Sequence, residues 1–316
     1  MGLCFALVAR GEIIVYDGFD YPPGTSLSGS GHDGFSWGTN AWIKGSSQSD
    51  WLVFTNSLTH PSIPATGNHV AETNLTQGAA YVRQFSTHIM TDGQSVWFSF
   101  LVRVSQGASW DLFFTSSGLN TSKFGVTASH VDYNIRARIG IGVPPSEDAI
   151  DLGQNATRLV VGRYRYSASD VEQLDLWVDP DISTEPMPGG PGTTNHLVYT
   201  RQHDSEPDRI DSVMLEDRSI GSVAIDELRI GTTWGDVISR SLDKASIESF
   251  TIAENTITLS LIRLTPGGTT TIERATDSPA SGAWHIADAF VTQARATNWV
   301  EARPDAGILL YRVLTE

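Results

Sequence analysis

The feature that most constrains this chain is its run of short apolar segments separated by turn-forming residues. The segments are rich in Val, Ile, Phe, Trp, Tyr and Thr, and Gly, Asn, Asp, Pro and Ser bound them. No stretch shows a sustained helical period of apolar residues. This pattern is typical of β-strands joined by turns, so the sequence predicts an all-β protein.

Two segments indicate how the strands are layered. Ser95–Val104 is the longest strand candidate and is apolar on both faces, which predicts a central strand covered on each side. Leu159–Tyr166 begins as a buried run and then alternates. The alternation predicts Arg163 and Arg165 on one face of the strand and Tyr164 on the other. Both segments favour a sandwich of two packed sheets.

The chain is predicted to hold a short leader and two β units. Residues 12–241 contain the longer strand candidates and form the large unit. Residues 246–316 contain short candidates separated by turns such as Thr265-Pro-Gly-Gly. This pattern fits a small sandwich of fibronectin-III or immunoglobulin-like size. A length of 316 residues agrees with one large and one small domain.

Residues 1–11 are predicted to be the truncated end of a secretory signal. Gly2–Ala9 is nearly all apolar but too short to span a bilayer, and small residues follow where cleavage is expected. The usual positively charged start is missing, which suggests a gene start further upstream. A first strand that begins early is the alternative. With the signal removed, the single cysteine, Cys4, is lost, and the mature protein is expected to be secreted, extracellular or at the cell surface. No membrane span is expected elsewhere.

The charge balance limits the classes of partner. Acidic residues outnumber basic ones by 36 to 21, which gives a net charge of −15. Proteins that bind nucleic acid or anionic membranes carry clustered Lys and Arg, so these classes are disfavoured. The balance suits a neutral partner such as a sugar, or a cation such as calcium. A single cysteine excludes an internal disulfide framework.

Two motifs resemble one family. Asp17-Gly-Phe-Asp-Tyr-Pro-Pro-Gly opens the large unit, followed by Trp37 and Trp42, and Ser222-Val-Ala-Ile-Asp-Glu-Leu-Arg-Ile-Gly closes it. The pair resembles the concanavalin A-like, or laminin G-like, jelly rolls of secreted proteins from environmental bacteria, particularly planctomycetes and verrucomicrobia. The resemblance covers residues 12 to about 240. The tail, which ends Tyr311-Arg-Val-Leu, resembles a small β module that often follows such domains.

The resemblance implies a two-sheet antiparallel jelly roll whose first and last strands lie side by side. It also implies a concave face, which is most often used to bind sugars, and a structural Ca2+ near the joined strands. Asp17, Asp20 and Asp226 stand at the matching positions, and Ca2+ prefers carboxylate and carbonyl oxygens. The alternative is that these aspartates cap turns or pair with Arg229.

The sequence contains no recognisable glycosidase motif. Laminarinase-type relatives place Glu-x-Asp-x-(x)-Glu on one strand, and the nearest approximation here starts at Glu172. Glu172 and Asp175 are an odd number of positions apart, so they face opposite sides of a strand. Asp175, Trp177 and Asp179 share one face, either as a sugar-binding stripe or as an ordinary solvent-facing set.

Lyase chemistry needs a Tyr or His base and a cationic or amide group beside the uronate. Arg163, Arg165, His130 and Tyr133 would form such a set only if their strands meet. We therefore name Tyr133, Arg163 and Arg165 as candidate ligand-binding residues and assign no catalytic residue.

Aromatic residues give the clearer functional signal. Tryptophan rings stack on the apolar C–H face of sugars, while amides and carboxylates bind the hydroxyl groups. Trp97 is expected in the core because it lies on the long central strand. Trp37, Trp42 and Trp110 lie in or beside loop-like segments and are the candidate sugar-binding rings.

Three functions follow as hypotheses. The first is a secreted, non-catalytic protein that binds a polysaccharide or glycan surface, or adheres through it. The second is a polysaccharide lyase or glycoside hydrolase with an atypical site. The third is a structural module of an envelope or matrix. Ionisable side chains that converge on one face would favour an enzyme, and exposed aromatic and amide groups would favour a binding module.

Overall fold

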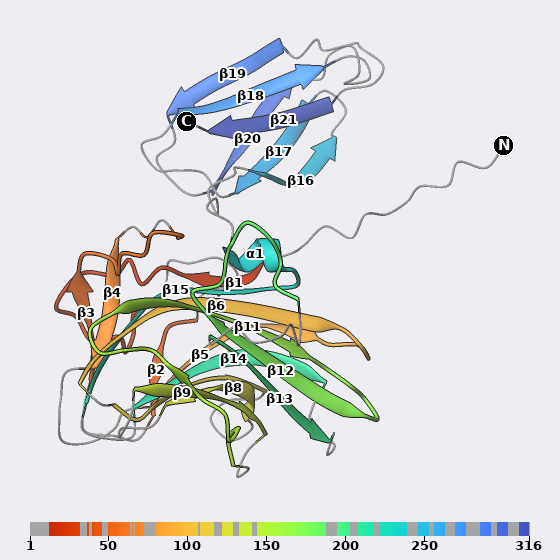
Figure 1. Ribbon diagram of the computed structural model, residues 1–316. Coiled ribbons are helices and arrows are strands. Elements are labelled where there is room, and N and C mark those ends of the chain that lie inside the picture. Colours follow the sequence, from red (N-terminus) through yellow and green to blue (C-terminus); the bar gives the residue numbers. More distant parts are fainter. Residues whose placement is uncertain are drawn as a thin grey trace. The chain divides into compact units, whose positions relative to one another are not determined.

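A computed structural model shows a nearly all-β protein made of two compact units, Met1–Ser239 and Arg240–Glu316 (Figure 1). The expected all-β class is confirmed. The signal segment, residues 1–11, and His130 lie outside the described residues. The structure describes residues 13–31, 37, 40–45, 50–63, 65, 67–72, 80–106, 108–116, 122–128, 133–140, 144–187, 195–202, 208–217, 221–238, 246–252, 256–262, 269–275, 285–291, 296–302 and 310–315.

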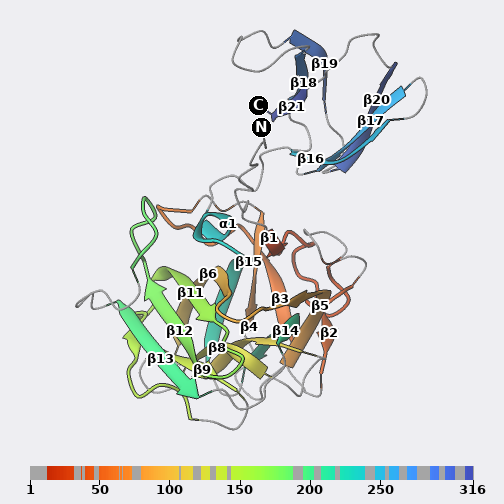
Figure 2. The ribbon, with the colours of Figure 1, turned by 90° about the vertical axis from the view of Figure 1, so that its right-hand side faces the viewer.

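The N-terminal unit is a sandwich of two antiparallel sheets (Figure 2). The strands of the eight-stranded sheet are β1 (Ile13–Asp17), β3 (Trp51–Thr55), β4 (Asn68–Glu72), β6 (Ser95–Gln106), β11 (Thr157–Arg165), β12 (Val171–Val178), β13 (His196–Gln202) and β15 (Ser222–Gly231). They follow the order β13-β12-β11-β6-β15-β4-β3, and β1 also pairs with β15. The two ends of this sheet are therefore β13 and β3.

The seven-stranded sheet forms the second layer. Its strands are β2 (Ile43–Lys44), β5 (Ala80–Ile89), β7 (Trp110–Thr115), β8 (Ser122–Ala128), β9 (Asn134–Ile139), β10 (Ile150–Asp151) and β14 (Arg209–Asp217). They follow the order β10-β9-β8-β7-β14-β5-β2. The chain crosses several times between the two layers, with runs such as β7 to β10 and β11 to β13 staying within one sheet, and the two layers together form the expected jelly roll.

The first and last strands of this unit lie side by side, as predicted. β1 pairs antiparallel with β15, from Ile13 opposite Gly231 to Asp17 opposite Leu228. We call this pairing the seam. The N-terminal half of β15 pairs instead with β4, and a bulge separates the two halves. Glu227 occupies the bulge in a left-handed conformation, with φ 53°. No helix lies between β1 and β15 in the part of the chain that the structure describes.

Aromatic side chains fill the space between the two sheets. Phe98 lies 4.8 Å from Phe114 between ring centroids, and Phe124 lies 4.1 Å from Tyr164 in a stacked arrangement. Such aromatic pairs add stability beyond their buried area. Gly162 is required by this packing, because a Cβ there would lie 2.0 Å from Cζ of Phe98. The core therefore fixes how closely β11 approaches β6.

The central strand β6 is buried on both faces, as its sequence predicts. Phe98 and Phe100 face the inner core, while Trp97 and Leu101 belong to a second apolar cluster on the other side of the sheet. The short helix α1 (Trp234–Ile238) contributes to that outer cluster. Within the described residues no helix has the length and apolar character needed to cross a bilayer.

The C-terminal unit is a second, smaller β-sandwich. Its strands are β16 (Ser246–Ile252), β17 (Thr256–Ile262), β18 (Thr269–Ala275), β19 (His285–Val291), β20 (Ala296–Ala302) and β21 (Leu310–Thr315). They form two three-stranded sheets, β16-β17-β20 and β19-β18-β21. Trp299 on β20 donates from Nε1 to Oδ2 of Asp288 on β19 at 2.8 Å, which joins the sheets.

Candidate functional site

The three tryptophans that we expected to bind sugar lie in the core. Trp37 and Trp42 are 1% exposed and Trp110 is 0% exposed. Trp37 donates from Nε1 to the Tyr16 carbonyl oxygen at 2.7 Å, and Trp42 stacks on Phe19. Stacking on a sugar requires an exposed ring face, and these positions provide none. The correction has a simple cause: hydrogen bonds to the seam hold Trp37 and Trp42 inside the sandwich, and Trp110 is an inward residue of β7.

Asp17 is the centre of a buried network that we call the Asp17 cluster, made of Asp17, Tyr21, Trp42 and Arg83. Oδ2 of Asp17 accepts hydrogen bonds from Tyr21 at 2.7 Å, Trp42 Nε1 at 2.9 Å and Arg83 Nη1 at 2.6 Å. Oδ1 accepts the Phe19 N–H at 2.9 Å. The carboxylate therefore holds the end of β1 to β5.

Arg83 supplies the positive charge of this cluster and is fully buried. Its Nε donates to the Asn40 carbonyl oxygen at 2.9 Å, and its Nη2 donates to the carbonyl oxygen of Gly31. The guanidinium also lies 4.2 Å from the ring centroid of Trp37. Burial raises the pKa of Asp17, while Arg83 and the hydrogen bonds act in the opposite direction.

The residues expected to bind Ca2+ do not form a site. The Asp17 carboxylate is bound to the Arg83 guanidinium, Asp20 is exposed, and Asp226 bonds to the Ser57 hydroxyl and, at 2.8 Å, to the Leu58 N–H. Among the described residues no group of three His, Cys, Asp or Glu side chains is placed to hold a metal ion. The three aspartates therefore do not fit the ion that the resemblance implied.

Asp226 lies instead within the bulge of β15. It is 0% exposed, and burial, followed by the neighbouring Glu227 carboxylate, raises its pKa to about 8 despite three hydrogen bonds. The hydrogen bonds come from Ser57, Leu58 and the Glu227 N–H. Asp226 therefore ties the 57–58 segment to the last strand and has a structural role.

The predicted lyase residues are not brought together. Arg163 and Arg165 share the outer face of β11, as predicted, and Arg163 donates to Oδ2 of Asp175 at 2.8 Å and lies over Trp97. Arg165 is exposed. Tyr133 precedes β9 in the other sheet and packs against the inner core. Arginines on one outer face and a tyrosine on the inner core cannot act on one substrate.

A pocket of about 490 Å³ lies where β12 ends and β13 begins. β13 is the edge strand of the eight-stranded sheet. We call it the Trp177 pocket. Trp177 and His196 are register partners on these strands, and their rings stack at 4.9 Å with planes 3° apart. The other lining residues are Val178, Asp179, Pro180, Asp181, Thr184, Glu185, Pro186, Met187 and Asn195.

The pocket combines apolar walls with an acidic rim. Met187 is 79% exposed, and prolines stand on either side of the loop. Asp181 and Glu185 are exposed, and the described lining contains no Lys or Arg. The Trp177 side chain is only 4% exposed, because the ring of Trp97 stacks on it at 5.7 Å between centroids, in addition to the ring of His196. The pocket therefore offers ring edges, proline and methionine carbons, and carboxylate and amide oxygens.

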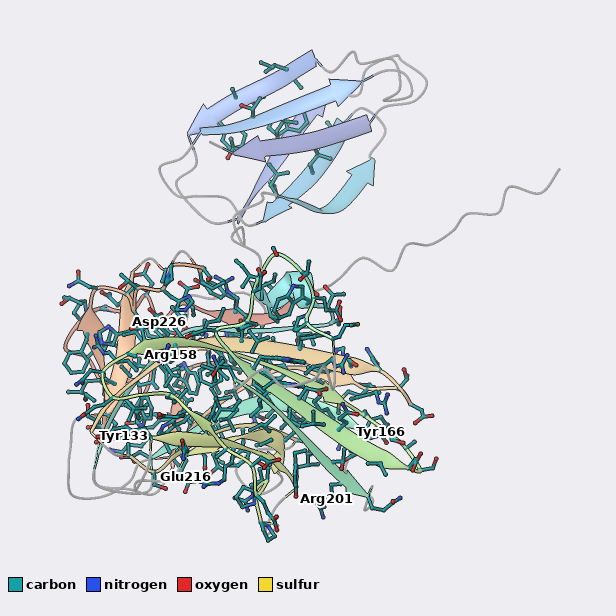
Figure 3. The ribbon with its side chains drawn as sticks, viewed as in Figure 1. Tyr133, Arg158, Tyr166, Arg201, Glu216 and Asp226 are labelled. Atoms are coloured by element: carbon teal, nitrogen blue, oxygen red, sulfur yellow. The ribbon has the colours of Figure 1, made fainter. Side chains whose placement is uncertain are left out.

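Asp179 anchors the rim to the sheet. Its backbone is left-handed, with φ 49°, and its N–H donates to the Leu159 carbonyl oxygen at 2.8 Å. Its carboxylate accepts from Arg158 at 2.8 Å and from the Leu159 N–H at 2.9 Å, and lies 3.0 Å from His60 Nε2 (Figure 3 labels Arg158). Burial raises the pKa of Asp179, but the hydrogen bonds of His60, Leu159 and Arg158 together lower it.

Part of this site was visible in the sequence. Asp175, Trp177 and Asp179 were expected on one face, either as a binding stripe or as a solvent-facing set. In the structure Asp175 is fully buried against Arg163, Trp177 packs in the outer cluster, and only Asp179 lines the rim with some exposure. The contributions of His196 and Met187 depend on the pairing of β12 with β13, and no sequence signal marked them.

A row of polar side chains crosses the seven-stranded sheet. Arg136, Thr127, Asp111 and Glu216 are successive register partners on β9, β8, β7 and β14. The inward side chains of β7 are those at alternate positions, including Trp110 and Leu112, so Asp111 faces away from the core. Glu216 lies on the opposite side of the sandwich from Asp226 (Figure 3). We call these four residues the cross-sheet row.

Comparisons with known proteins give no family and only remote structural similarity. No protein-family model matches the chain, and no curated protein matches its sequence. Among solved structures, the endo-β-1,4-glucuronan lyase of Trichoderma reesei is 11% identical, with a TM-score of 0.37, over 62% of this chain and 92% of that one. The CBM2 module of the evolved Dit of Lactobacillus casei BL23 phage J-1 is 12% identical, with a TM-score of 0.39, over 71% and 96%.

The exoplasmic/lumenal domain of VIP36, in a form bound to Ca2+ and Man3GlcNAc, is 10% identical, with a TM-score of 0.36, over 61% of this chain and 83% of that one. Identities and scores this low identify no equivalent residues and transfer no activity. The class that the strand order and register define is therefore a two-sheet antiparallel jelly roll followed by a small β-sandwich.

Proposed function

We propose that the N-terminal unit is a non-catalytic glycan-binding domain that acts outside the cell, and that the Trp177 pocket is its binding site. The observation that carries this proposal is the pocket itself. A volume of about 490 Å³ lies in the range of small-molecule sites, which are mostly apolar with a few placed polar groups. The extracellular location rests on the leader predicted from the sequence.

The pocket chemistry suits one or two sugar rings. The C–H face of a pyranose packs against the carbons of Pro180, Pro186 and Met187, and its hydroxyl groups donate to carboxylate oxygens on the rim. The Asn195 side chain both donates and accepts. Because Asp179 is held by hydrogen bonds on both oxygens, one part of the rim is already ordered before a ligand arrives.

Two pocket variants test this proposal. A glycan array should give at least one hit with the full chain, and Met187→Ser should weaken that hit roughly fivefold, since buried apolar contact contributes about 0.8 kcal/mol for each CH2 group. Ile89→Ser is the matched control, because Ile89 is 62% exposed on the other sheet. An array without a hit across plant, algal and bacterial polysaccharides would favour the structural-module hypothesis. Equal effects of the two variants would remove the pocket from the proposal.

The cross-sheet row favours a second candidate function, glycoside hydrolysis. Asp111 and Glu216 are direct register partners, so their Cβ atoms are about 4.5–5.5 Å apart. Retaining glycosidases use two carboxyl groups about 5–5.5 Å apart as acid and nucleophile, and the side chains of register partners on one face of a sheet can bring two carboxyl groups within such a distance. Asp111 is 1% exposed, and Glu216 is partly exposed.

Reducing-sugar release from any glycan bound on the array tests this second function. Glu216→Gln should abolish the release and leave binding intact, because the amide keeps the shape and loses the acid. Asp211→Asn is the control on the same strand. The absence of any release, or release that survives Glu216→Gln, would exclude the row as a catalytic centre.

A further inference from the structure

The described lining of the Trp177 pocket carries acidic side chains and no basic ones. Three carboxylates line the pocket, on Asp179, Asp181 and Glu185, and no Lys or Arg does so among its described lining. The charge of Asp179 is matched by Arg158 at 2.8 Å, and the carboxylate also lies 3.0 Å from His60 Nε2. Asp181 and Glu185 form none of the described salt bridges, so the rim carries excess negative charge.

The two outer acids are held on a short ordered turn. Oδ1 of Asp181 accepts the Ser183 N–H at 2.9 Å, and this hydrogen bond, with that of the Ser183 hydroxyl, lowers the pKa of Asp181. Pro180 and Pro186 restrict the backbone on both sides of the turn. The Asp181 carboxylate is therefore ionised in neutral and mildly acidic buffer, where amines are also charged.

We propose that the Trp177 pocket selects its glycan by charge, binding sugars that carry an ammonium group more tightly than neutral sugars, and neutral sugars more tightly than uronates. The inference rests on the proposed glycan-binding function and adds the class of ligand. An ammonium group placed at the rim gains attraction from Asp181 and Glu185. A uronate carboxylate at the same place is repelled, and the net charge of −15 adds to that repulsion.

The size of the effect follows from exposed charge pairs. Each exposed pair contributes modestly, so the ammonium-bearing and neutral ligands should differ roughly two- to fivefold in affinity for each carboxylate involved. Added salt should reduce the difference, because charges are screened over about 10 Å at 0.1 M ionic strength. Apolar packing is insensitive to salt of this concentration, so binding of the neutral ligand should change little.

The experiment measures the affinity of the full chain, by calorimetry, for three oligosaccharides with the same β-1,4-linked gluco backbone. They are glucosamine oligomers, cello-oligomers and glucuronic acid oligomers, and the glycan array carries the same three classes on other backbones. The variant Asp181→Asn/Glu185→Gln should bring the three affinities together.

The control variant Asp92→Asn/Asp170→Asn removes the same charge from exposed acids in the turns before β6 and β12, and should leave the order of the three affinities unchanged. Asp170 and Asp181 flank β12, an 8-residue strand, and so lie roughly 25 Å apart.

Two kinds of failure are distinguishable. If none of the three classes binds on any backbone, the proposed function is wrong, and this inference falls with it. If uronates bind as tightly as the amino sugars, or if the control variant changes the order as much as the pocket variant does, only the inference of charge selection is overturned. Affinities that decrease from the ammonium-bearing to the neutral to the carboxylate-bearing oligomers, and that become equal in the pocket variant, support both the proposed function and the inference of charge selection.

Discussion

Two aspartate–arginine pairs of the N-terminal unit have the same chemistry and opposite surroundings. In the Asp17 cluster, Asp17 and Arg83 are 2.6 Å apart, and their side chains are 1% and 0% exposed. At the Trp177 pocket, Asp179 and Arg158 are 2.8 Å apart, and their side chains are 24% and 36% exposed. The first pair lies between the sheets, and the second lies at the edge of one.

The comparison shows how burial decides the use of an ion pair. Burial raises the pKa of Asp17, so the carboxylate depends on Arg83 and its hydrogen bonds to stay ionised. At Asp179 the hydrogen bonds outweigh burial and lower the pKa. A fully buried pair is out of reach of a ligand and can only hold the fold together, whereas a partly exposed pair can also order a binding surface.

Arg83→Met should have the largest effect. It leaves the Asp17 carboxylate buried without its cation, which should lower the free energy of unfolding by about 3–5 kcal/mol. Urea denaturation followed by tryptophan fluorescence measures this. The double variant Asp17→Asn/Arg83→Met should recover part of the loss, since it removes the unmatched charge. A single variant as stable as the parent protein would contradict a structural role for the cluster.

Asp226 is buried like Asp17, but its described hydrogen bonds come from Ser57, Leu58 and the Glu227 N–H and not from an arginine. Its pKa in the folded protein is about 8 and its ordinary value is 3.8, so the folded state binds the proton more tightly. The contribution of Asp226 to the free energy of unfolding is fully present at pH values below its ordinary pKa of 3.8, and it is lost as the pH rises through about 8. The free energy of unfolding should fall by roughly a few kcal/mol between pH 5 and pH 8.

Asp226→Asn is the matched variant for the pH experiment. The asparagine cannot titrate and keeps an oxygen that can accept a hydrogen bond, so its stability should be flatter across the same range. Urea denaturation at several pH values compares the two proteins. Parallel curves for the parent protein and the variant would show that Asp226 does not titrate in this range.

Asp179→Asn should have a small effect on stability and a larger one on binding. Asn tolerates the left-handed backbone that Asp179 adopts, so the turn should persist. The pair with Arg158 is half-exposed, and its loss should cost about 1 kcal/mol or less. Thermal unfolding and glycan affinity are measured on the same sample. A loss as large as that of Arg83→Met would show that the two pairs do not differ in role.

A chelator should have the smallest effect. Because Arg83 already neutralises Asp17, and Asp226 lies in a separate network, EDTA should leave the melting temperature unchanged. A ligand that binds only the folded state stabilises it, so removal of a structural Ca2+ would lower the melting temperature. A fall on adding EDTA that added Ca2+ reverses would place an ion elsewhere in the chain.

The fold was predictable from local patterns. The length of Ser95–Val104 and its apolar residues on both faces identified the central strand, since a strand that is covered on both faces must be apolar on both. The same reasoning separated Arg163 and Arg165 from Tyr164. The resemblance of the opening and closing motifs predicted the seam, which the pairing of β1 with β15 confirms.

The candidate site was less predictable, because a residue type does not specify its exposure. Trp37 and Trp42 looked like loop tryptophans, yet both bond to the seam and are buried. Asp17 looked like a calcium ligand, but β5 places Arg83 beside it. In both cases the deciding partner is far away in the sequence.

By itself, the sequence determined the all-β class, the strand that occupies the centre and the faces of individual strands. These depend on the spacing of apolar residues along the chain, which is a local property. Only the tertiary structure decided which charges are matched. It placed Arg83 against Asp17, set Trp177 beside His196 and left Asp181 and Glu185 at the rim. Burial and electrostatic partners arise from contacts between distant segments, and no local pattern encodes them.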